Sequence, residues 1–421
     1  MNLAKHSSLQ PGLAKPSRQP QRLAWLEGIR MLAAVMILLY HAQLLISEYA
    51  YTPQPTGLLA NLQAIATASD RLGLHAFGFI AFPAWFGYQF VDVFVLISGF
   101  SLVLSLKGQP IQPGRFIKQR VLRILFPFWT VAWLSVPCLW LVGTLTNSYI
   151  PNAWNLFAAA TFPLLFDYSG ELLLPISGPW WFVSLILSFA VVFPFLWRCL
   201  QTWGSRNLLL VSLGVTLVYR ALAVYVFGGH PTYMILDTPA NWFPFLAFLA
   251  KLSTFVVGMV VARWSLRDRG PILWSQRRAL AVGVPLYVVG FVCQFYRVGW
   301  IVADLLVPLG LLLVGMVAFR AIAVGRWAAT LRWLGKHSYS YFLIHNFVVD
   351  RTINLFVQGN LERYYLALPG MMLGTLALAV IADGITPLLR QGLDEGLREL
   401  DGRLSKKRSV QFPVGPGRSL R

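Results

Sequence analysis

Long apolar segments recur along the whole chain and are separated by shorter polar stretches. About ten of them are roughly 17–25 residues long, the length that an α-helix needs to cross the hydrocarbon core of a bilayer. They lie at 29–47, 83–106, 124–146, 179–200, 208–228, 242–262, 279–296, 300–319, 338–357 and 365–388. This pattern predicts an all-α polytopic membrane protein with about ten transmembrane helices.

The basic residues between these segments predict how the helices are oriented. If the N-terminus is cytoplasmic, the Lys- and Arg-rich stretches 107–123, 263–278 and 320–336 all fall on the cytoplasmic side. The loops on the other side then carry few basic residues, namely Arg71, Arg297 and Arg363. Because cytoplasmic loops carry an excess of Lys and Arg, this alternation predicts that both termini are cytoplasmic.

The chain divides into three expected parts. Residues 1–24 are polar and basic and lack the apolar core of a cleaved signal peptide, which predicts a disordered cytoplasmic tail. Residues 25–388 are expected to form the membrane domain, and residues 389–421 a basic cytoplasmic tail. The longest outside loops, 48–82 and 147–178, are polar and turn-rich and could cover an outward-facing mouth.

The composition excludes several classes of protein. The chain is 57% hydrophobic and only 12% charged, against roughly 25% charged residues in soluble proteins. Its net charge of +19 comes from basic residues between apolar segments, so contact with membrane lipids explains that charge better than a nucleic-acid partner. Cys138, Cys199 and Cys293 are far apart, so we expect neither a metal site nor a disulfide framework.

Arg30 and His41 stand out because they interrupt the first apolar segment. Ionisable residues inside a membrane helix are costly and usually mark function. At ~100° and ~1.5 Å per residue, eleven steps return to nearly the same helix face, about 16 Å further along the axis. One face therefore presents a permanent cation near the cytoplasmic surface and a proton acceptor deeper in the membrane.

Four local patterns, in this order, resemble those of a known family. The first, at 27–41, is an acidic residue, Gly, an apolar residue and Arg, followed after ten residues by His. The second is the segment 87–100, which ends in Ser-Gly-Phe, and the third is the basic stretch 115–127. The fourth is the Leu-Gly-Lys-x-Ser-Tyr-Ser element at 334–345. Residues 255–262 resemble a further Phe-x-x-Gly-Met stretch. The family is the acyltransferase 3 type of membrane acyltransferases, which transfer acyl groups to hydroxyls of cell-surface sugars and other glycan- or lipid-linked acceptors.

The chain departs from that family at two places. Met31 stands where the family usually has Gly. Many members carry a Glu shortly after the Trp-x-x-Ser of the fourth span, whereas here Trp181–Ser184 is followed by Leu185 and Ile186. A catalytic role for that Glu cannot be carried over to this chain.

The resemblance implies roles for the two residues of the first span. His41 would act as the base that removes a proton from the acceptor hydroxyl, although a lone buried His is more often a structural hydrogen-bonding residue. Arg30 could hold a phosphate of the donor. Alternatively it is an interfacial Arg that orients the helix and pairs with Glu27 three residues earlier.

Other candidates are less specific. Asp92, in the second span, needs a partner, and we expect it either to orient His41 as part of the catalytic group or to pair with Arg30. The structural alternative is a hydrogen bond that holds two helices together. Ser98 could be a nucleophile, but with Gly99 it more readily forms a small-residue helix contact. A cytoplasmic cluster could bind coenzyme A phosphates or anionic lipid headgroups equally well; its members are Arg115, Arg120 and Arg123.

Polar residues in later spans add further candidates. Tyr341 and His345 lie one turn apart on the ninth span, and His345 is either a second histidine of the site or a structural one. Four more charged residues require interior partners that the sequence does not identify: Arg220, Lys251, Asp304 and Asp383.

These features together favour one function and leave two alternatives. The favoured one is an O-acyltransferase of the plasma membrane (the bacterial inner membrane), with no bound cofactor, taking its acyl group from cytoplasmic acyl-CoA, with acetyl-CoA as the expected donor. A secondary transporter or lipid-linked glycan translocase is the first alternative, although such proteins often show paired halves and broken helices. The missing fourth-span carboxylate also keeps a non-catalytic scaffold open.

Overall fold

The computed structural model describes residues 23–73, 78–106, 108–148, 150, 152, 154, 178–230 and 247–411. Every regular element in these ranges is helical. The α-helices are α1 (Ala24–Ile46), α2 (Leu58–Arg71), α3 (Gly78–Ala84), α4 (Phe90–Leu106), α5 (Pro113–Thr146), α9 (Trp181–Tyr225), α11 (Phe248–Ser265), α12 (Gln276–Cys293), α13 (Ala303–Ile322), α14 (Gly325–Thr352) and α15 (Leu361–Gln411). Short 3-10 helices are η2 (Gly87–Gln89), η3 (Gly178–Trp180), η5 (Pro271–Leu273) and η6 (Val298–Ile301), and η7 (Ile353–Val357) is a π-helix.

The helices have membrane-spanning character. Within the described residues, seven helices are long and apolar enough to cross a bilayer. One of them contains α9, which joins the segments predicted at 179–200 and 208–228 across a kink at Gly204. The predicted multi-pass all-α class is therefore confirmed, while the count of ten spans and the cytoplasmic placement of the termini stay predictions.

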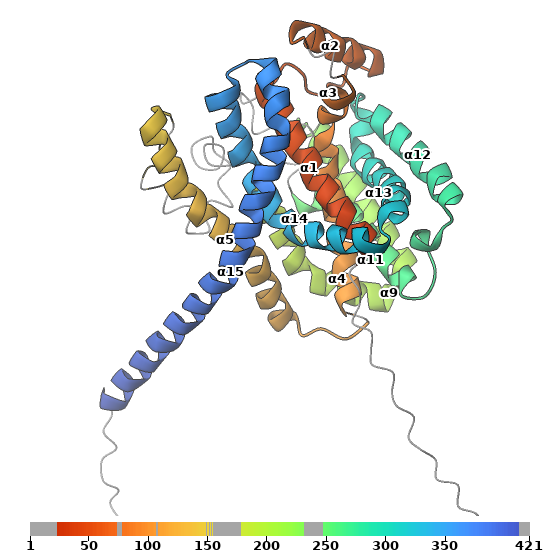
Figure 1. The fold of residues 1–421 in the computed structure, drawn as a ribbon. Coiled ribbons are helices and arrows are strands. Elements are labelled where there is room, and N and C mark those ends of the chain that lie inside the picture. Colours follow the sequence, from red (N-terminus) through yellow and green to blue (C-terminus); the bar gives the residue numbers. More distant parts are fainter. Residues whose placement is uncertain are drawn as a thin grey trace, which may run out of the picture.

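Helix α1 lies at the centre of the bundle. It packs mainly against α14, with α13 and α4 on other sides (Figure 1). A helix that is apolar all round belongs in an interior, and α1 has buried residues along its whole length, including Ala34 and Leu38, which have no exposed surface. Enclosure on several sides fixes the direction in which the side chains of α1 point.

Small residues set the crossing of α4 and α11. A Cβ at Gly99 would collide with the carbonyl oxygen of Phe255, and one at Gly258 with that of Leu96. The two backbones can approach so closely only because both positions are glycine. The small-residue helix contact predicted at Ser98–Gly99 is confirmed at Gly99.

The segment predicted as the outside loop 48–82 is largely helical. It contains α2 and α3, which lie together at one end of the bundle (Figure 1). Their side chains Ile65 and Ala81 join a buried cluster with Tyr40 and Leu44 of α1. This part of the chain therefore packs over the end of the helix that carries His41.

The expected tails and the other long loop have different outcomes. Residues 1–22 of the predicted N-terminal tail, and most of loop 147–178, lie outside the described residues. The basic segment predicted as a tail from residue 389 begins as a helix, because α15 continues to Gln411 and extends away from the bundle (Figure 1).

Candidate active site

His41 lies beside a second histidine. His345 of α14 places its Nε2 3.2 Å from Nδ1 of His41, and the ring centroids are 5.0 Å apart. His345 has no exposed surface, whereas His41 is partly exposed. The structure thus brings together two residues 304 positions apart in the sequence.

The hydrogen bonds of the pair define which nitrogen of each ring carries a proton. Nδ1 of His41 lies 2.9 Å from the carbonyl oxygen of Ile37, and Nδ1 of His345 contacts that of Phe342. A carbonyl oxygen only accepts, so both Nδ1 atoms donate and both Nε2 atoms carry the lone pair in the neutral rings. The Nδ1–H of His41 therefore has two acceptors, Ile37 O and His345 Nε2, and its own Nε2 is left as a base.

Aromatic rings lie beside His41. The ring of Tyr40 lies 5.3 Å from that of His41 and also 5.3 Å from that of Tyr88, which follows directly after Gly87. A Cβ at Gly87 would collide with the carbonyl oxygen of Met36, so glycine allows η2 to approach α1 there. This close approach holds Tyr88 against Tyr40, while its hydroxyl donates to Gln294.

Tyr341 is one helical turn before His345 and is fully buried. Its hydroxyl has no hydrogen-bond partner among the described residues. Buried hydroxyls are normally satisfied, so this orphaned donor is consistent with a polar group entering beside the histidine pair. Tyr341 stays a candidate for contact with a substrate.

Arg30 and Glu27 form the ion pair that the sequence allowed. Nη1 of Arg30 lies 3.3 Å from Oε2 of Glu27, and the Arg30 side chain is 29% exposed. Its Nε is buried and has no partner among the described residues, so the guanidinium keeps donors for an anion. Glu27 packs directly on Gly335 of α14, which joins the first and fourth sequence patterns in space.

The basic residues of α5 differ in how deeply they are buried. Arg120 is half-buried, and the positive charges of Arg123 and Arg30 act on it. Arg115 and Arg123 are exposed, with Arg115 in the first turn of α5. The charge of Arg30 is therefore felt at Arg120, whereas Arg115 lies at the start of the helix.

Neither functional partner expected for Asp92 is found, and the carboxylate instead joins two packed helices, as the structural alternative predicted. Its carboxylate lies 2.9 Å from Nζ of Lys251, and neither His41 nor Arg30 is its partner. A buried carboxylate is stable only when it is paired with a cation, and the packing of α11 against α4 places Lys251 beside Asp92. The partner of His41 among the described residues is instead His345, at its Nδ1.

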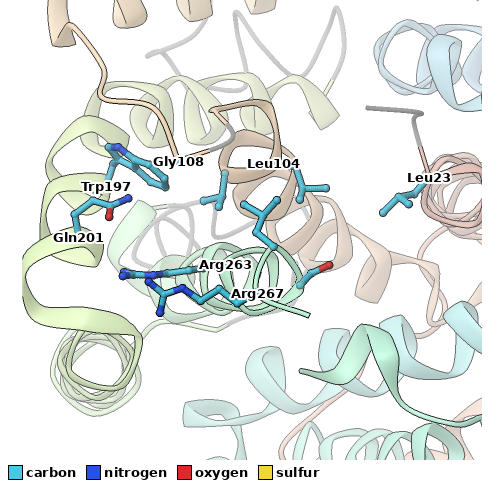
Figure 2. A pocket seen from close by; sticks show the side chains of 10 residues that line it. Leu23, Leu104, Gly108, Trp197, Gln201, Arg263 and Arg267 are labelled. Carbon is cyan, nitrogen blue, oxygen red and sulfur yellow. The ribbon is translucent and has the colours of Figure 1, made fainter. Parts of the chain in front are cut away.

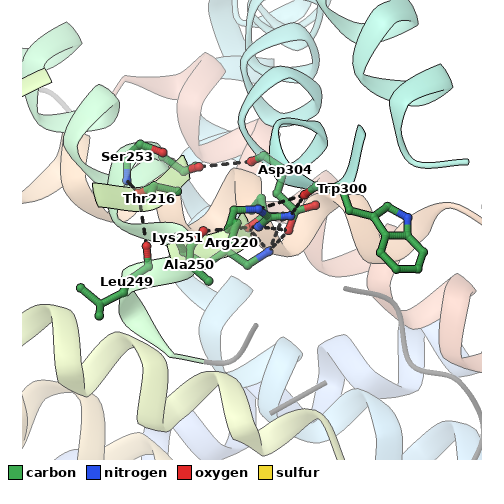
Figure 3. A network of polar contacts seen from close by, with 10 residues as sticks. Thr216, Arg220, Leu249, Ala250, Lys251, Ser253, Trp300 and Asp304 are labelled. Atoms are coloured by element: carbon green, nitrogen blue, oxygen red, sulfur yellow. Dashed lines mark hydrogen bonds and ion pairs between the residues drawn. The ribbon is translucent and has the colours of Figure 1, made fainter. Parts of the chain in front are cut away.

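Lys251 connects Asp92 to a larger buried network. Lys251 also bonds to Asp304, which accepts from Nη1 of Arg220 at 2.7 Å (Figure 3). Arg220 is 1% exposed and donates from Nε to the carbonyl oxygen of Trp300 at 3.0 Å. Two cations and two carboxylates thus balance in charge across α4, α9, α11 and α13.

The sequence flagged the members of this network without pairing them. They come from four helices that are far apart in the chain, so no local spacing could have joined them. A cavity of about 20 Å³ adjoins the network, lined in part by Asp304, Tyr88 and Gln294. Such a volume holds about one water molecule, which is too small for a sugar acceptor.

Asp383 is paired in a separate cluster. Its Oδ2 lies 2.5 Å from Nδ1 of His337, and its Oδ1 accepts a hydrogen bond from the hydroxyl of Ser340. This contact connects α14 to α15. His337 was not among the sequence candidates, because an isolated His next to a Lys carries no distinctive signal.

The arrangement has two levels along α1. Arg30, with Arg120 near it, forms a cationic level, and His41 with His345 forms a basic, proton-accepting level about 16 Å further along the helix. The first level suits an anionic group, and the second suits removal of a proton from a hydroxyl.

One comparison with known proteins gives a match. A family model described as an acyltransferase domain, of the acyltransferase 3 type, matches residues 23–383. No curated protein and no solved structure matches the chain. The matched range includes both levels of the site and confirms the resemblance expected from the four sequence patterns.

Proposed function

Because the chain belongs to the acyltransferase 3 family, we propose that it is an integral-membrane O-acyltransferase of the bacterial inner membrane. It takes an acyl group, in the first instance acetyl, from cytoplasmic acyl-CoA and transfers it to a hydroxyl of a glycan, lipid-linked sugar or similar acceptor. The observation that carries the proposal is the fixed ring of His41, whose Nε2 lone pair is free while Nδ1–H has two acceptors.

In the proposed reaction Nε2 of His41 takes the proton of the acceptor hydroxyl while the oxygen attacks the thioester carbonyl. The tetrahedral intermediate then breaks its C–S bond, and the leaving thiolate takes the proton from His41. The products are the O-acyl ester and the free thiol, and His41 returns to its neutral form. Ile37 O and His345 Nε2 both accept from Nδ1–H and therefore stabilise the imidazolium that forms.

A covalent route uses the same atoms in a different order. Nε2 of His41 would attack the thioester, release the thiolate and form an acyl-imidazole that the hydroxyl then attacks. Rapid mixing with labelled donor in the absence of acceptor distinguishes the two routes. Label held on His41 before acceptor is added supports the covalent route, and its absence supports direct transfer.

Arg30 is proposed to bind a donor phosphate. Its exposed fraction and its unpartnered Nε support this role, and Arg120 adds a second positive charge nearby. The donor would then approach from the cytoplasmic end of α1 and present its thioester toward His41. The acceptor would approach from the end covered by α2 and α3.

The test uses purified protein in nanodiscs with radiolabelled acetyl-CoA and surface glycan from the source membrane. His41→Ala is expected to abolish transfer while leaving the protein folded, as judged by its thermal unfolding and elution profile. Arg30→Gln should raise the KM for donor with a smaller effect on kcat. Wild-type transfer by His41→Ala would refute the mechanism. Flux of substrate into sealed proteoliposomes, without acyl transfer, would favour a transporter instead.

A further inference from the structure

A second pocket lies on the side of α4 where that helix ends. It has a volume of about 620 Å³, within the ~300–1,000 Å³ typical of small-ligand sites. It lies between the start of α1 and the ends of α4 and α11, with α9 at one side (Figure 2). All of these ends fall on the side that the basic residues predict to be cytoplasmic.

The lining combines positive charge, an aromatic ring and an apolar wall. Arg263 of α11 and Arg267, just after that helix, lie on one side of the pocket, and Leu104 of α4 lies across from them (Figure 2). Trp197 and Gln201 come from α9. No carboxylate is among the described residues that line the pocket, so its electrostatic character is that of an anion site.

The two arginines differ in how tightly they are held. Arg263 is half-buried and donates to the carbonyl oxygen of Leu200, which ties α11 to α9. Arg267 is exposed, in the turn that follows α11. The indole of Trp197 is steadied by Phe193, whose ring is nearly parallel to it at an angle of 19°. Trp197 is only 5% exposed, so it forms part of the firm apolar wall of the pocket, whereas the amide of Gln201 is exposed at its edge.

The pocket also lies in line with Arg30 and His41 along α1. Leu23, at the start of α1, is part of its lining. Seven residues, or about 10 Å, separate Leu23 from Arg30, and at ~100° per residue both lie on one face of α1. His41 is a further eleven residues along that same face. Pocket, cation and base therefore follow one another in that order along one helix.

We infer that this pocket binds the nucleotide end of the acyl-CoA donor, an inference that rests on the proposed function. The adenine would lie against the apolar wall that includes Leu104, with the exposed amide of Gln201 as its hydrogen-bond partner, and the 3′-phosphate would pair with Arg267. The diphosphate would extend toward Arg30, and the pantetheine arm toward His41. An anionic lipid headgroup offers the same phosphate chemistry, so the experiment must separate these two sources.

The experiment compares two ligands with two variants in nanodiscs of neutral lipid. Binding of coenzyme A and of dephospho-coenzyme A, which lacks the 3′-phosphate, is measured by calorimetry on wild type, Arg267→Gln and Arg269→Gln. Arg269 is another exposed arginine, two residues further on, that is not among the described residues lining the pocket. It is therefore a control for the loss of one positive charge.

In the wild type, loss of the 3′-phosphate should weaken binding about tenfold, which corresponds to about 1.4 kcal/mol. In Arg267→Gln, coenzyme A itself should bind about tenfold more weakly, and dephospho-coenzyme A should then bind almost equally well. Arg269→Gln should keep the wild-type ratio. Such non-additivity is expected only where the side chain and the phosphate are in contact.

The possible failures are distinguishable. If wild type binds no coenzyme A, the proposed function fails. If wild type binds it and Arg267→Gln keeps the tenfold ratio, the donor site lies elsewhere and only this inference is overturned. If the ratio is kept while Arg267→Gln loses co-purified anionic phospholipid, the pocket is a lipid site. Acetyl-pantetheine, which has no nucleotide, should show the same KM with Arg267→Gln as with wild type.

Discussion

The role of Asp92 can be tested by removing its charge together with that of its partner. Asp92→Asn leaves Lys251 with one carboxylate fewer, and Lys251→Met leaves Asp92 without a cation. The double variant Asp92→Asn/Lys251→Met removes one positive and one negative charge. It leaves Arg220 paired with Asp304 at 2.7 Å, so the network stays neutral.

The magnitude follows from burial. The side chains of Lys251 and Asp92 are 8% and 9% exposed. Removing one member of such a buried pair costs about 3–5 kcal/mol, because the remaining charge is buried without compensation, whereas replacing both members is often nearly neutral. We therefore expect each single variant to lose about 3–5 kcal/mol of stability and the double variant to lose less than either.

The assay is reversible unfolding in mixed micelles, combined with acyl-transfer rates on the folded fraction. A double variant that is destabilised by the sum of the single effects would refute the assignment of the pair. Activity decides the second question. If Asp92 acts only by pairing with Lys251, the folded double variant transfers acyl groups at close to the wild-type rate. A loss of transfer similar to that of His41→Ala would instead restore Asp92 to the catalytic group.

Three further variants test other contacts of the site. Gly335→Ala should cost about 1–3 kcal/mol, as overpacking of an interior does, because its Cβ would collide with Glu27; Gly370→Ala, which has open space, should unfold like the wild type in the same assay. His345→Ala should lower kcat about tenfold with an unchanged KM in initial-rate measurements, since it removes one of two hydrogen bonds to the imidazolium; an unchanged kcat would remove His345 from the site. Ser98→Ala should keep most of the transfer activity, and a loss of more than a hundredfold would identify a nucleophile.

The length of the hydrophobic segments was enough to predict the class of the fold. Apolar segments of membrane length fold as helices because a bilayer leaves the backbone few other ways to satisfy its hydrogen bonds. The same argument is less informative for polar segments. The region 48–82 was expected as a loop, yet α2 carries Asn61 as an internal hydrogen-bonding residue that organises the turn before it, and such local contacts are not visible in hydropathy.

The candidate site was predictable where its residues share one helix and not where they come from several. Arg30 and His41 were identified because helical geometry relates positions within a segment. His345 could be named as a candidate but not placed, and Asp92 was given a wrong partner, because contacts between helices depend on which faces pack. Gly99 and Gly258 decide that packing for α4 and α11, and a glycine in a sequence does not reveal its opposing residue.

The contacts of α1 with α14 explain why the first and fourth sequence patterns act as one unit. Glu27 meets Gly335 near one end, and His41 meets His345 near the other, so the two helices run in the same direction. Two contacts at different levels fix both the register and the closeness of the pair. A slide of one turn, about 5.4 Å, would separate the histidines, whose nitrogens are only 3.2 Å apart. A side chain at position 335 that forces α14 away from Glu27 should therefore reduce catalysis at His41 even though it touches neither histidine.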